Sequence, residues 1–273
     1  RRQRFKYLHQ TSTIMNSLDN LFQNKKSGIL NIYFTAGYPE LNDTITILES
    51  LEKAGVDIVE VGIPYSDPLA DGQTIQDSSQ IALQNGITLK KVFEQIKEAR
   101  LTVSIPIVVM GYFNQFLQYG MDKFLDNLKE AGADGVIIPD LPLKYYKTHY
   151  QEKFKANDIK ICFLITPETS DFRIKEADRL STGFLYVVAQ SSITGGKKEI
   201  SKQQEQYFNK IKDMHLSSPT LIGFGIHDKQ TFETACNYAN GAIIGSAFIR
   251  QLKNSGMDSV DAFVAGIKMN YEL

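Results

Sequence analysis

The feature that most limits the possible folds is an alternation of two patterns along nearly the whole chain. Short apolar runs rich in β-branched residues, which are typical of buried strands, alternate with segments whose apolar residues recur at helical spacing. Eight strand–helix units of about 30 residues follow one another. This alternation favours parallel strands joined by helical crossovers. The expected strands are Ile29–Thr35, Val56–Pro64, Ile105–Met110, Gly135–Asp140, Ile159–Thr166, Phe184–Ala189, Thr220–Phe224 and Gly241–Gly245.

The number of units favours a closed barrel. Eight units in about 250 residues are typical of the (β/α)₈ barrel, an α/β fold. A doubly wound open sheet is the alternative, but the first strand is not followed by the G-x-G-x-x-G turn of a dinucleotide-binding sheet. We therefore predict one (β/α)₈ barrel domain over residues 15–273. The basic stretch 1–14 is expected to be a non-native or disordered extension, with the end of a transit peptide as the alternative.

The helical segments also have predictable ends. Asn16 or Ser17 can cap a short helix that precedes the first strand. Three of the later segments are expected to be single helices: one carrying Phe116 to Leu128, one over Leu143–Ala156, and one from Phe248 to about Met269.

Composition excludes several classes of function. The formal net charge is −1, so neither nucleic acid nor an anionic membrane is an expected partner. No apolar run reaches the roughly 18 residues of a membrane-spanning helix. The four histidines and two cysteines lack the spacing of a metal site, so no metal is expected. We expect the cysteines to be reduced thiols of a cytoplasmic protein.

Two carboxylates stand out in the stretch from Val56 to Thr74. Glu60 lies inside the second expected strand, which is apolar on both faces, and burying an acid is costly unless a site requires it. Asp71 lies on the loop that leaves the same strand. The alternative is that Glu60 ends the strand in water or pairs with a buried Lys or Arg. In a barrel, the carboxyl ends of the strands form the active site, which favours a catalytic pair.

The loops after the last three expected strands favour phosphate binding. Each contains glycine or a small hydroxyl residue, and backbone N–H groups near a helix N-terminus are the usual phosphate site of this fold. A single such glycine is more often an ordinary turn, but three successive loops favour a phosphate. No Lys lies at an expected strand end, which disfavours Schiff-base chemistry. Further polar residues at expected strand ends are Tyr112, Asn114 and Asp140.

Five segments, in order and with matching spacing, resemble the tryptophan synthase alpha subunit family. They are Tyr33–Pro39 (YFTAGYP), Glu60–Gln76 (EVGIPYSDPLADGQTIQ), Ile193–Gly196 (ITGG), Gly223–Ile226 (GFGI) and Gly245–Ala247 (GSA). The resemblance runs from about Ser17 to Leu252. It implies a barrel enzyme, a carbon–carbon lyase of tryptophan biosynthesis, that cleaves indole-3-glycerol phosphate to indole and glyceraldehyde 3-phosphate. It also implies an α₂β₂ complex in which pyridoxal phosphate belongs to the beta subunit, so that this chain needs no cofactor.

The resemblance further implies roles for individual residues. Glu60 matches the general acid/base, and Asp71 matches the carboxylate that meets the indole nitrogen. The other matched positions surround the substrate: Tyr186 beside Glu60, Thr194 on a mobile loop, and the phosphate-binding Gly195, Gly225, Gly245 and Ser246. We expect the apolar strand to raise the pKa of Glu60 toward neutrality, while Asp71, on a wetter loop, stays ionised.

One loop departs from the family pattern. Gln190 stands where an arginine is common, and Ser192 where a glycine is common. We expect these changes to affect loop closure and coupling to the beta subunit more than the chemistry. They motivate a second hypothesis, a regulatory subunit that is weakly active alone and activates the beta subunit. A third is another phosphosugar barrel, such as an isomerase.

Overall fold

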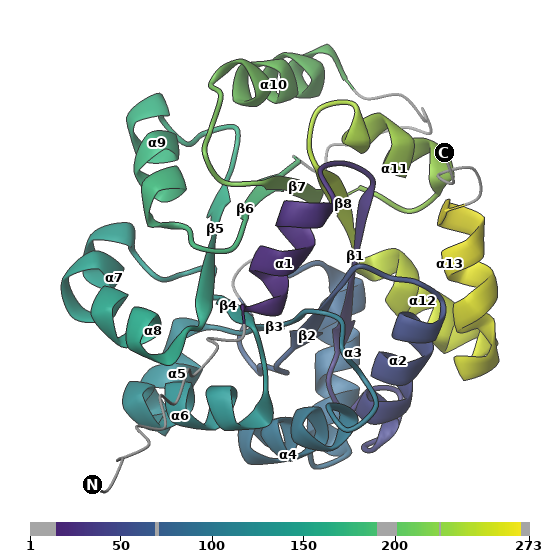
Figure 1. Ribbon diagram of the computed structural model, residues 1–273. Helices are drawn as coiled ribbons and strands as arrows, with labels where there is room; N and C mark the ends of the chain where they lie inside the picture. Colours follow the sequence, from purple (N-terminus) through teal and green to yellow (C-terminus); the bar gives the residue numbers. More distant parts are fainter. Residues whose placement is uncertain (1–14, 69–70, 190–200, 224, 269–273) are drawn as a thin grey trace, which may run out of the picture.

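Eight parallel strands close into a barrel in the order β1 to β8, and β8 pairs back with β1 (Figure 1). The computed structural model describes residues 15–68, 71–189, 201–223 and 225–268. The predicted (β/α)₈ barrel is thus confirmed, and the doubly wound open sheet is wrong. The strands are β1 (Ile29–Thr35), β2 (Ile58–Gly62), β3 (Ile107–Met110), β4 (Gly135–Ile137), β5 (Lys160–Ile165), β6 (Leu185–Val188), β7 (Thr220–Gly223) and β8 (Gly241–Ile244).

Each strand lies within its predicted range, and only β1 fills the whole of it. The prediction for β2 was too long at both ends, for local reasons. At the start, the N–H of Val56 donates to the carbonyl of Leu51 and so belongs to the end of the preceding helix. At the other end, Pro64 has no N–H to give to a sheet.

The helices lie around the barrel, as Figure 1 shows. They are α2 (Asp43–Lys53), α3 (Gln73–Gln84), α4 (Leu89–Ala99), α5 (Phe113–Tyr119), α6 (Met121–Ala131), α7 (Leu143–His149), α8 (Gln151–Asn157), α9 (Asp171–Leu180), α10 (Lys202–Asp213), α11 (Lys229–Cys236), α12 (Ser246–Ser255) and α13 (Val260–Lys268), with a 3₁₀ turn over Met257–Ser259. Among the described residues, no helix has both the length and the apolarity that crossing a bilayer requires.

Three segments predicted as single helices are broken, so that part of the prediction was wrong. The breaks fall at Gly120 (φ +90°), Tyr150 (φ −126°) and Gly256 (φ +69°). The two glycines adopt positive φ angles that other residues reach only at a cost, and a helix cannot continue through them. Apolar residues recur at helical spacing on both sides of each break, so the sequence pattern predicted one continuous helix.

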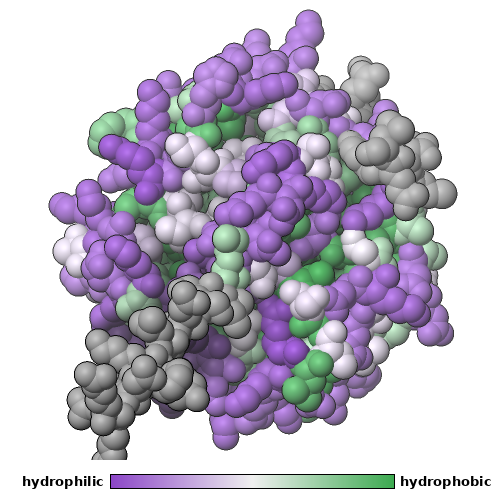
Figure 2. Space-filling model, in the orientation of Figure 1, coloured by the Kyte–Doolittle hydropathy of each residue, from purple (hydrophilic) through white to green (hydrophobic). Residues whose placement is uncertain are grey.

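A short helix, α1 (Ser17–Asn24), closes the amino end of the barrel (Figure 1). Asn16 caps it as predicted, since its side chain accepts a hydrogen bond from the N–H of Leu18 at 3.0 Å. Leu18 and Phe22 are buried in the same apolar cluster as Ile58 and Val108 of the barrel interior. The opposite side of α1 is polar and exposed, and Figure 2 shows hydrophilic residues gathered at the centre of this face, where α1 lies, with hydrophobic patches around them. The amphipathic helix therefore fills the amino end of the barrel with side chains.

Candidate active site

Glu60 points into the barrel from the middle of β2. Ile58, two residues before it, belongs to the interior cluster, whereas Val59 and Val61 pack in the layer between strands and helices. Because side chains alternate along a strand, Glu60 shares the inward face with Ile58. Its exposed fraction is 0%. The alternative of a strand end in water is therefore wrong.

The hydrogen-bond partner of Glu60 is an amide on the neighbouring strand. Asn31 Nδ2 of β1 donates to Glu60 Oε1 at 2.5 Å, and Asn31 is also 0% exposed. Within the part of the chain that the structure describes, Glu60 forms no ion pair, so the Lys or Arg pairing considered above is not observed. Glu60 Oε2 and Asn31 Oδ1 have no hydrogen-bond partner among the described residues. Asn31 was not among the predicted site residues, although an amide within an apolar strand was a usable signal.

Two tyrosine side chains also point into the barrel interior near Glu60. Tyr33 lies opposite Glu60 in the β1–β2 register, and Tyr186 points inward from β6. A Cβ atom on Gly62 would overlap the hydroxyl of Tyr33, and one on Gly223 would overlap that of Tyr186. The two glycines therefore leave the space that the tyrosine hydroxyls occupy.

The electrostatics of this region suit proton exchange near neutral pH. Burial raises the pKa of Glu60 to about 8, while the hydrogen bond from Asn31 acts in the opposite direction. Burial also raises the pKa of Tyr33, of Tyr186 and of the Cys162 thiol on β5, and the charge of Glu60 adds to each shift. These three neighbours stay neutral while Glu60 titrates, so Glu60 can hold and release a proton near neutral pH, as expected from its strand.

Asp71 lies at the mouth of the barrel, on the loop between β2 and α3. Its Oδ2 accepts a hydrogen bond from the hydroxyl of Tyr112 at 3.1 Å. Burial raises the pKa of Asp71 and the Tyr112 hydroxyl lowers it. The expected wetter loop is thus partly wrong, because this carboxylate is half-buried. Asp71 and Glu60 both raise the pKa of Tyr33 and of Tyr186, so the two carboxylates lie within electrostatic range of the same two tyrosines.

Of the other polar residues predicted at strand ends, one contacts the candidate site and two stabilise a loop. Tyr112 joins the site through Asp71. Asn114 Nδ2 donates to the hydroxyl of Tyr65 at 3.2 Å, and Asp140 accepts from the N–H of Phe113 at 2.8 Å. These latter two contacts hold the loop after β3 in place.

The predicted phosphate-binding residues that the structure describes lie beyond β7 and β8. Gly225 has φ +80°, and Gly245 with Ser246 forms the start of α12. No side chain caps this helix and its first turn has no acid, so its first N–H groups can meet an anion. A Cβ on Gly245 would lie 3.3 Å from the ring of Tyr33, which places this end of α12 at the same mouth as Glu60. Thr194, Gly195, Gln190 and Ser192 lie outside the described residues.

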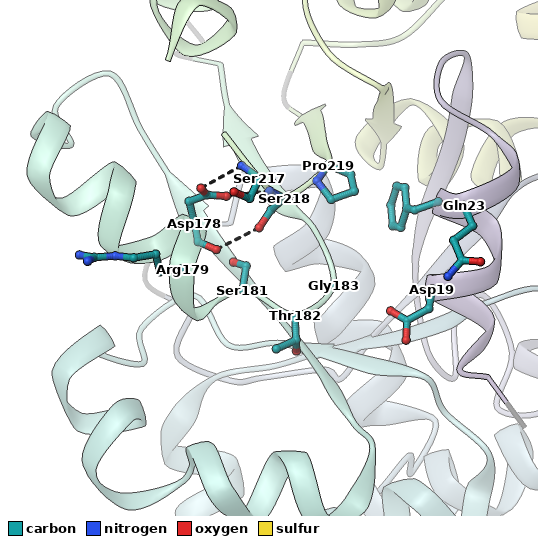
Figure 3. A pocket seen from close by; sticks show the side chains of 11 residues that line it. Asp19, Gln23, Asp178, Arg179, Ser181, Thr182, Gly183, Ser217, Ser218 and Pro219 are labelled. Carbon is teal, nitrogen blue, oxygen red and sulfur yellow. Dashed lines mark hydrogen bonds between the residues drawn. The ribbon is translucent and has the colours of Figure 1, made fainter. Parts of the chain in front are cut away.

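A separate cavity lies at the opposite end of the barrel (Figure 3). Its volume is about 450 Å³, and α1 and the segments leading into β6 and β7 line it. The N–H groups of Ser217 and Ser218 donate to the carboxylate of Asp178 at 3.0 and 2.8 Å. This cavity contains neither of the two carboxylates of the mouth, and the hydrogen bonds of Asp178 hold the loop before β7.

The raised pKa of Glu60 predicts a pH dependence of stability. The folded protein keeps this proton up to about pH 8, whereas the unfolded chain releases it near pH 4.5. The free energy of unfolding should therefore fall as pH rises from 4.5 to 8, by on the order of a few kcal/mol from this group. Glutamine does not titrate, so the free energy of unfolding of a Glu60→Gln variant lacks this fall. The difference in free energy of unfolding between the variant and the unsubstituted protein should therefore shift in favour of the variant from pH 4.5 to 8 and stay constant above pH 8.

Urea unfolding at pH 5 to 9 measures this difference. The comparison isolates Glu60, because every other titrating group is common to both proteins. Replacing the exposed Glu94 of α4 by Gln is the control for the removal of a surface carboxyl outside the barrel interior. Parallel curves for the Glu60→Gln variant and the unsubstituted protein would contradict a raised pKa.

Comparison with known proteins agrees with this geometry. Residues 19–270 match the family model described as tryptophan synthase alpha chain. A tryptophan synthase alpha chain from Flavobacterium psychrophilum is 51% identical over 93% of this chain and 100% of its own length. One from Christiangramia forsetii is 48% identical over 93% of this chain and 99% of its own length.

Two solved structures are similar to this chain, each with a TM-score of 0.81. Tryptophan synthase from M. tuberculosis, in an aminoacrylate-bound form, is 26% identical over 93% of this chain and 98% of its own. The tryptophan synthase complex from Pyrococcus furiosus is 33% identical over 89% and 98%.

Proposed function

Because this chain belongs to the tryptophan synthase alpha chain family, and is therefore a lyase of tryptophan biosynthesis, we propose that it catalyses the alpha reaction at Glu60 and Asp71. This reaction cleaves indole-3-glycerol phosphate to indole and glyceraldehyde 3-phosphate. The observation that carries the assignment of the residues is Glu60 itself, a fully buried carboxyl with a pKa raised to about 8 inside the barrel. Such a group can exchange protons near neutral pH.

Glu60 can serve both proton transfers of the cleavage. In its acid form it donates a proton to C3 of the indole ring, which produces a cationic indolenine. The carboxylate that remains then takes the proton of the hydroxyl on the adjacent chain carbon. As that hydroxyl becomes a carbonyl, the carbon–carbon bond breaks and its electrons return to the indole ring. The net change moves one proton from oxygen to C3, and Glu60 ends in its starting form.

Asp71 stabilises the charge that the first step creates. An ionised carboxylate facing the indole N–H offsets the positive charge that develops on the ring. The hydroxyl of Tyr112, which donates to Asp71 Oδ2 at 3.1 Å, orients this carboxylate and favours its ionised form. The two carboxyl groups thus differ in role because they differ in surroundings.

The loops beyond β7 and β8 hold the phosphate. The first N–H groups of α12 and its helix dipole favour an anion at Gly245 and Ser246, with Gly225 beside them. Thr194 and Gly195 complete this site in our proposal by their match to the family pattern.

The partner that we propose is a tryptophan synthase beta subunit, in an α₂β₂ complex. The support is that the similar structures from M. tuberculosis and P. furiosus are described as tryptophan synthase and as its complex. In this proposal pyridoxal phosphate belongs to the beta subunit alone, because acid–base chemistry at Glu60 needs no cofactor. A cytoplasmic location, which is also part of this proposal, fits two cysteines that are not joined in a disulfide.

Product analysis tests the proposal. The purified chain, incubated with indole-3-glycerol phosphate, should release indole and glyceraldehyde 3-phosphate in equal amounts, and a beta subunit should raise the rate. If phosphosugar is consumed without indole, the isomerase hypothesis replaces ours. If the chain alone is no faster than its Glu60→Gln variant yet still activates a beta subunit, the regulatory hypothesis is favoured.

A further inference from the structure

Two buried polar side chains meet across β1 and β2, at the level just below the mouth of the barrel. Asn31 pairs in register with Ile58, and Tyr33 pairs with Glu60, so Asn31 lies diagonally from Glu60, one inward position nearer to α1. Its Nδ2 is 2.5 Å from Glu60 Oε1. Asn31 therefore contacts Glu60 from the closed side of the barrel, whereas Tyr33 lies next to Glu60 in the strand register.

We propose that Asn31 is a positioning residue for Glu60: its amide holds Oε1 and leaves Oε2 as the oxygen that exchanges protons with the substrate. The inference rests on the proposed function, in which Glu60 is the general acid/base. The geometry that carries it is the single short hydrogen bond to Oε1, together with the absence of a partner for Oε2 among the described residues.

The surroundings of Asn31 make a purely structural role a poor explanation. The inward residues next to it, Ile29 and Ile58, are fully buried and apolar. An amide in such a layer costs free energy unless it is hydrogen-bonded, and an aliphatic side chain would fill the same space without that cost. Asn31 Oδ1 has no hydrogen-bond partner in the described part of the chain. Among the described residues, the hydrogen bond from Nδ2 to Glu60 is therefore the side-chain contact that offsets the cost of burying this amide.

An amide suits a partner that changes its protonation state. Asn31 can donate to the carboxylate of Glu60 and, after rotation of the amide, can accept from the carboxylic acid. A leucine of similar size can do neither. A hydrogen bond to the ionised form lowers the pKa of an acid, which is the direction in which Asn31 acts on Glu60.

The other groups that face Glu60 do not titrate in the same range. Tyr33 on β1, Cys162 on β5 and Tyr186 on β6 have pKa values raised by burial, so they stay neutral near pH 8. Asp71 at the mouth is the other carboxyl that acts on these tyrosines, and it accepts from Tyr112. Removing the amide of Asn31 therefore removes the hydrogen bond that favours the ionised form of Glu60.

The test is an Asn31→Leu variant of the full chain, in which the ionisation of Glu60 is followed directly. Carboxyl ¹³C NMR of glutamate-labelled protein gives the titration, and the Glu60→Gln spectrum assigns the signal. The pKa of Glu60 should rise by on the order of one pH unit. In the profile of kcat/KM against pH, the apparent pKa that reports Glu60 should also move to higher pH. In addition, kcat should fall roughly 10- to 100-fold with little change in KM.

Thr35→Val is the matched control. Thr35 is also fully buried on β1, but its hydroxyl pairs with Ser78 Oγ at 2.7 Å and hydrogen-bonds with Tyr33, and it has no hydrogen bond to Glu60, so its loss should leave the Glu60 titration in place. Asn31→Ser, whose hydroxyl is too short to reach Glu60, repeats the test without added bulk should the leucine variant not fold.

The outcomes separate the two proposals. A Glu60 titration that is unchanged in both Asn31 variants overturns the positioning role, whatever happens to activity. A titration that moves together with the pH profile and kcat supports it. A titration that moves while the pH profile and kcat stay unchanged confirms that Asn31 controls the ionisation of Glu60, but removes Glu60 from the mechanism and so refutes the residue assignment in the proposed function.

Discussion

Replacing Glu60 by Gln is expected to lower kcat for indole release by roughly 10⁴-fold, the upper end of what general acid–base catalysis contributes, because one carboxyl supplies both proton transfers in the proposed mechanism. Glutamine has nearly the same shape and can still accept the hydrogen bond from Asn31 through its amide oxygen. It has no acidic proton to give to C3 and no carboxylate to receive the hydroxyl proton. KM should change little, because the phosphate site is untouched.

Steady-state release of indole by the isolated chain measures this effect, with circular dichroism to show that the fold is intact. Glu94→Gln, on the exposed side of α4, is the control and should retain full activity. Turnover near the normal rate in the Glu60→Gln variant would mean that another group supplies the proton.

Replacing Asp71 by Asn should lower kcat strongly but less completely, by roughly 10²-fold, which is typical of losing one preorganised electrostatic contact to the transition state. Asparagine can still accept from the Tyr112 hydroxyl, so the loop should keep its place. What is lost is the negative charge beside the indole nitrogen when the ring becomes cationic. Proton transfer by Glu60 remains, which is why this variant should keep more activity than Glu60→Gln.

The same assay on the isolated chain tests Asp71, with Asp67→Asn as a control from the same loop. Asp67 is exposed and accepts from the hydroxyl of Ser66 at 2.6 Å, so its carboxylate is bound by its own loop, whereas that of Asp71 is bound by Tyr112. If Asp71→Asn and Asp67→Asn are equally active, the charge at the indole nitrogen must be offset by another residue.

The sequence was informative where a residue conflicted with its local pattern or where the pattern repeated. Eight repeats identified the barrel, and an acid within an apolar strand identified Glu60. The breaks at Gly120 and Gly256 were missed because the apolar spacing continues across them. The residues whose roles depend on another unit of the chain were harder to find.

Asn31 and the half-buried state of Asp71 depend on contacts between units. Asn31 matters because register places it diagonally from Glu60 on the next strand, and no spacing within β1 contains that information. Asp71 is half-buried because a tyrosine from the β3 unit meets it, and the sequence of its own loop indicated only turns. The roles of Thr194 and Gly195 stay predictions.

The helix across the amino end of the barrel has a consequence for how products depart. Since Leu18 and Phe22 pack into that end among the described residues, the proposed reaction would take up its substrate and release both products at the opposite end, toward which the strands carrying Glu60 and Tyr186 run. In the proposed reaction indole is uncharged, whereas glyceraldehyde 3-phosphate would be held through its phosphate at α12. The order of release is then set by which of the two lies nearer the opening and by how long the phosphate stays bound.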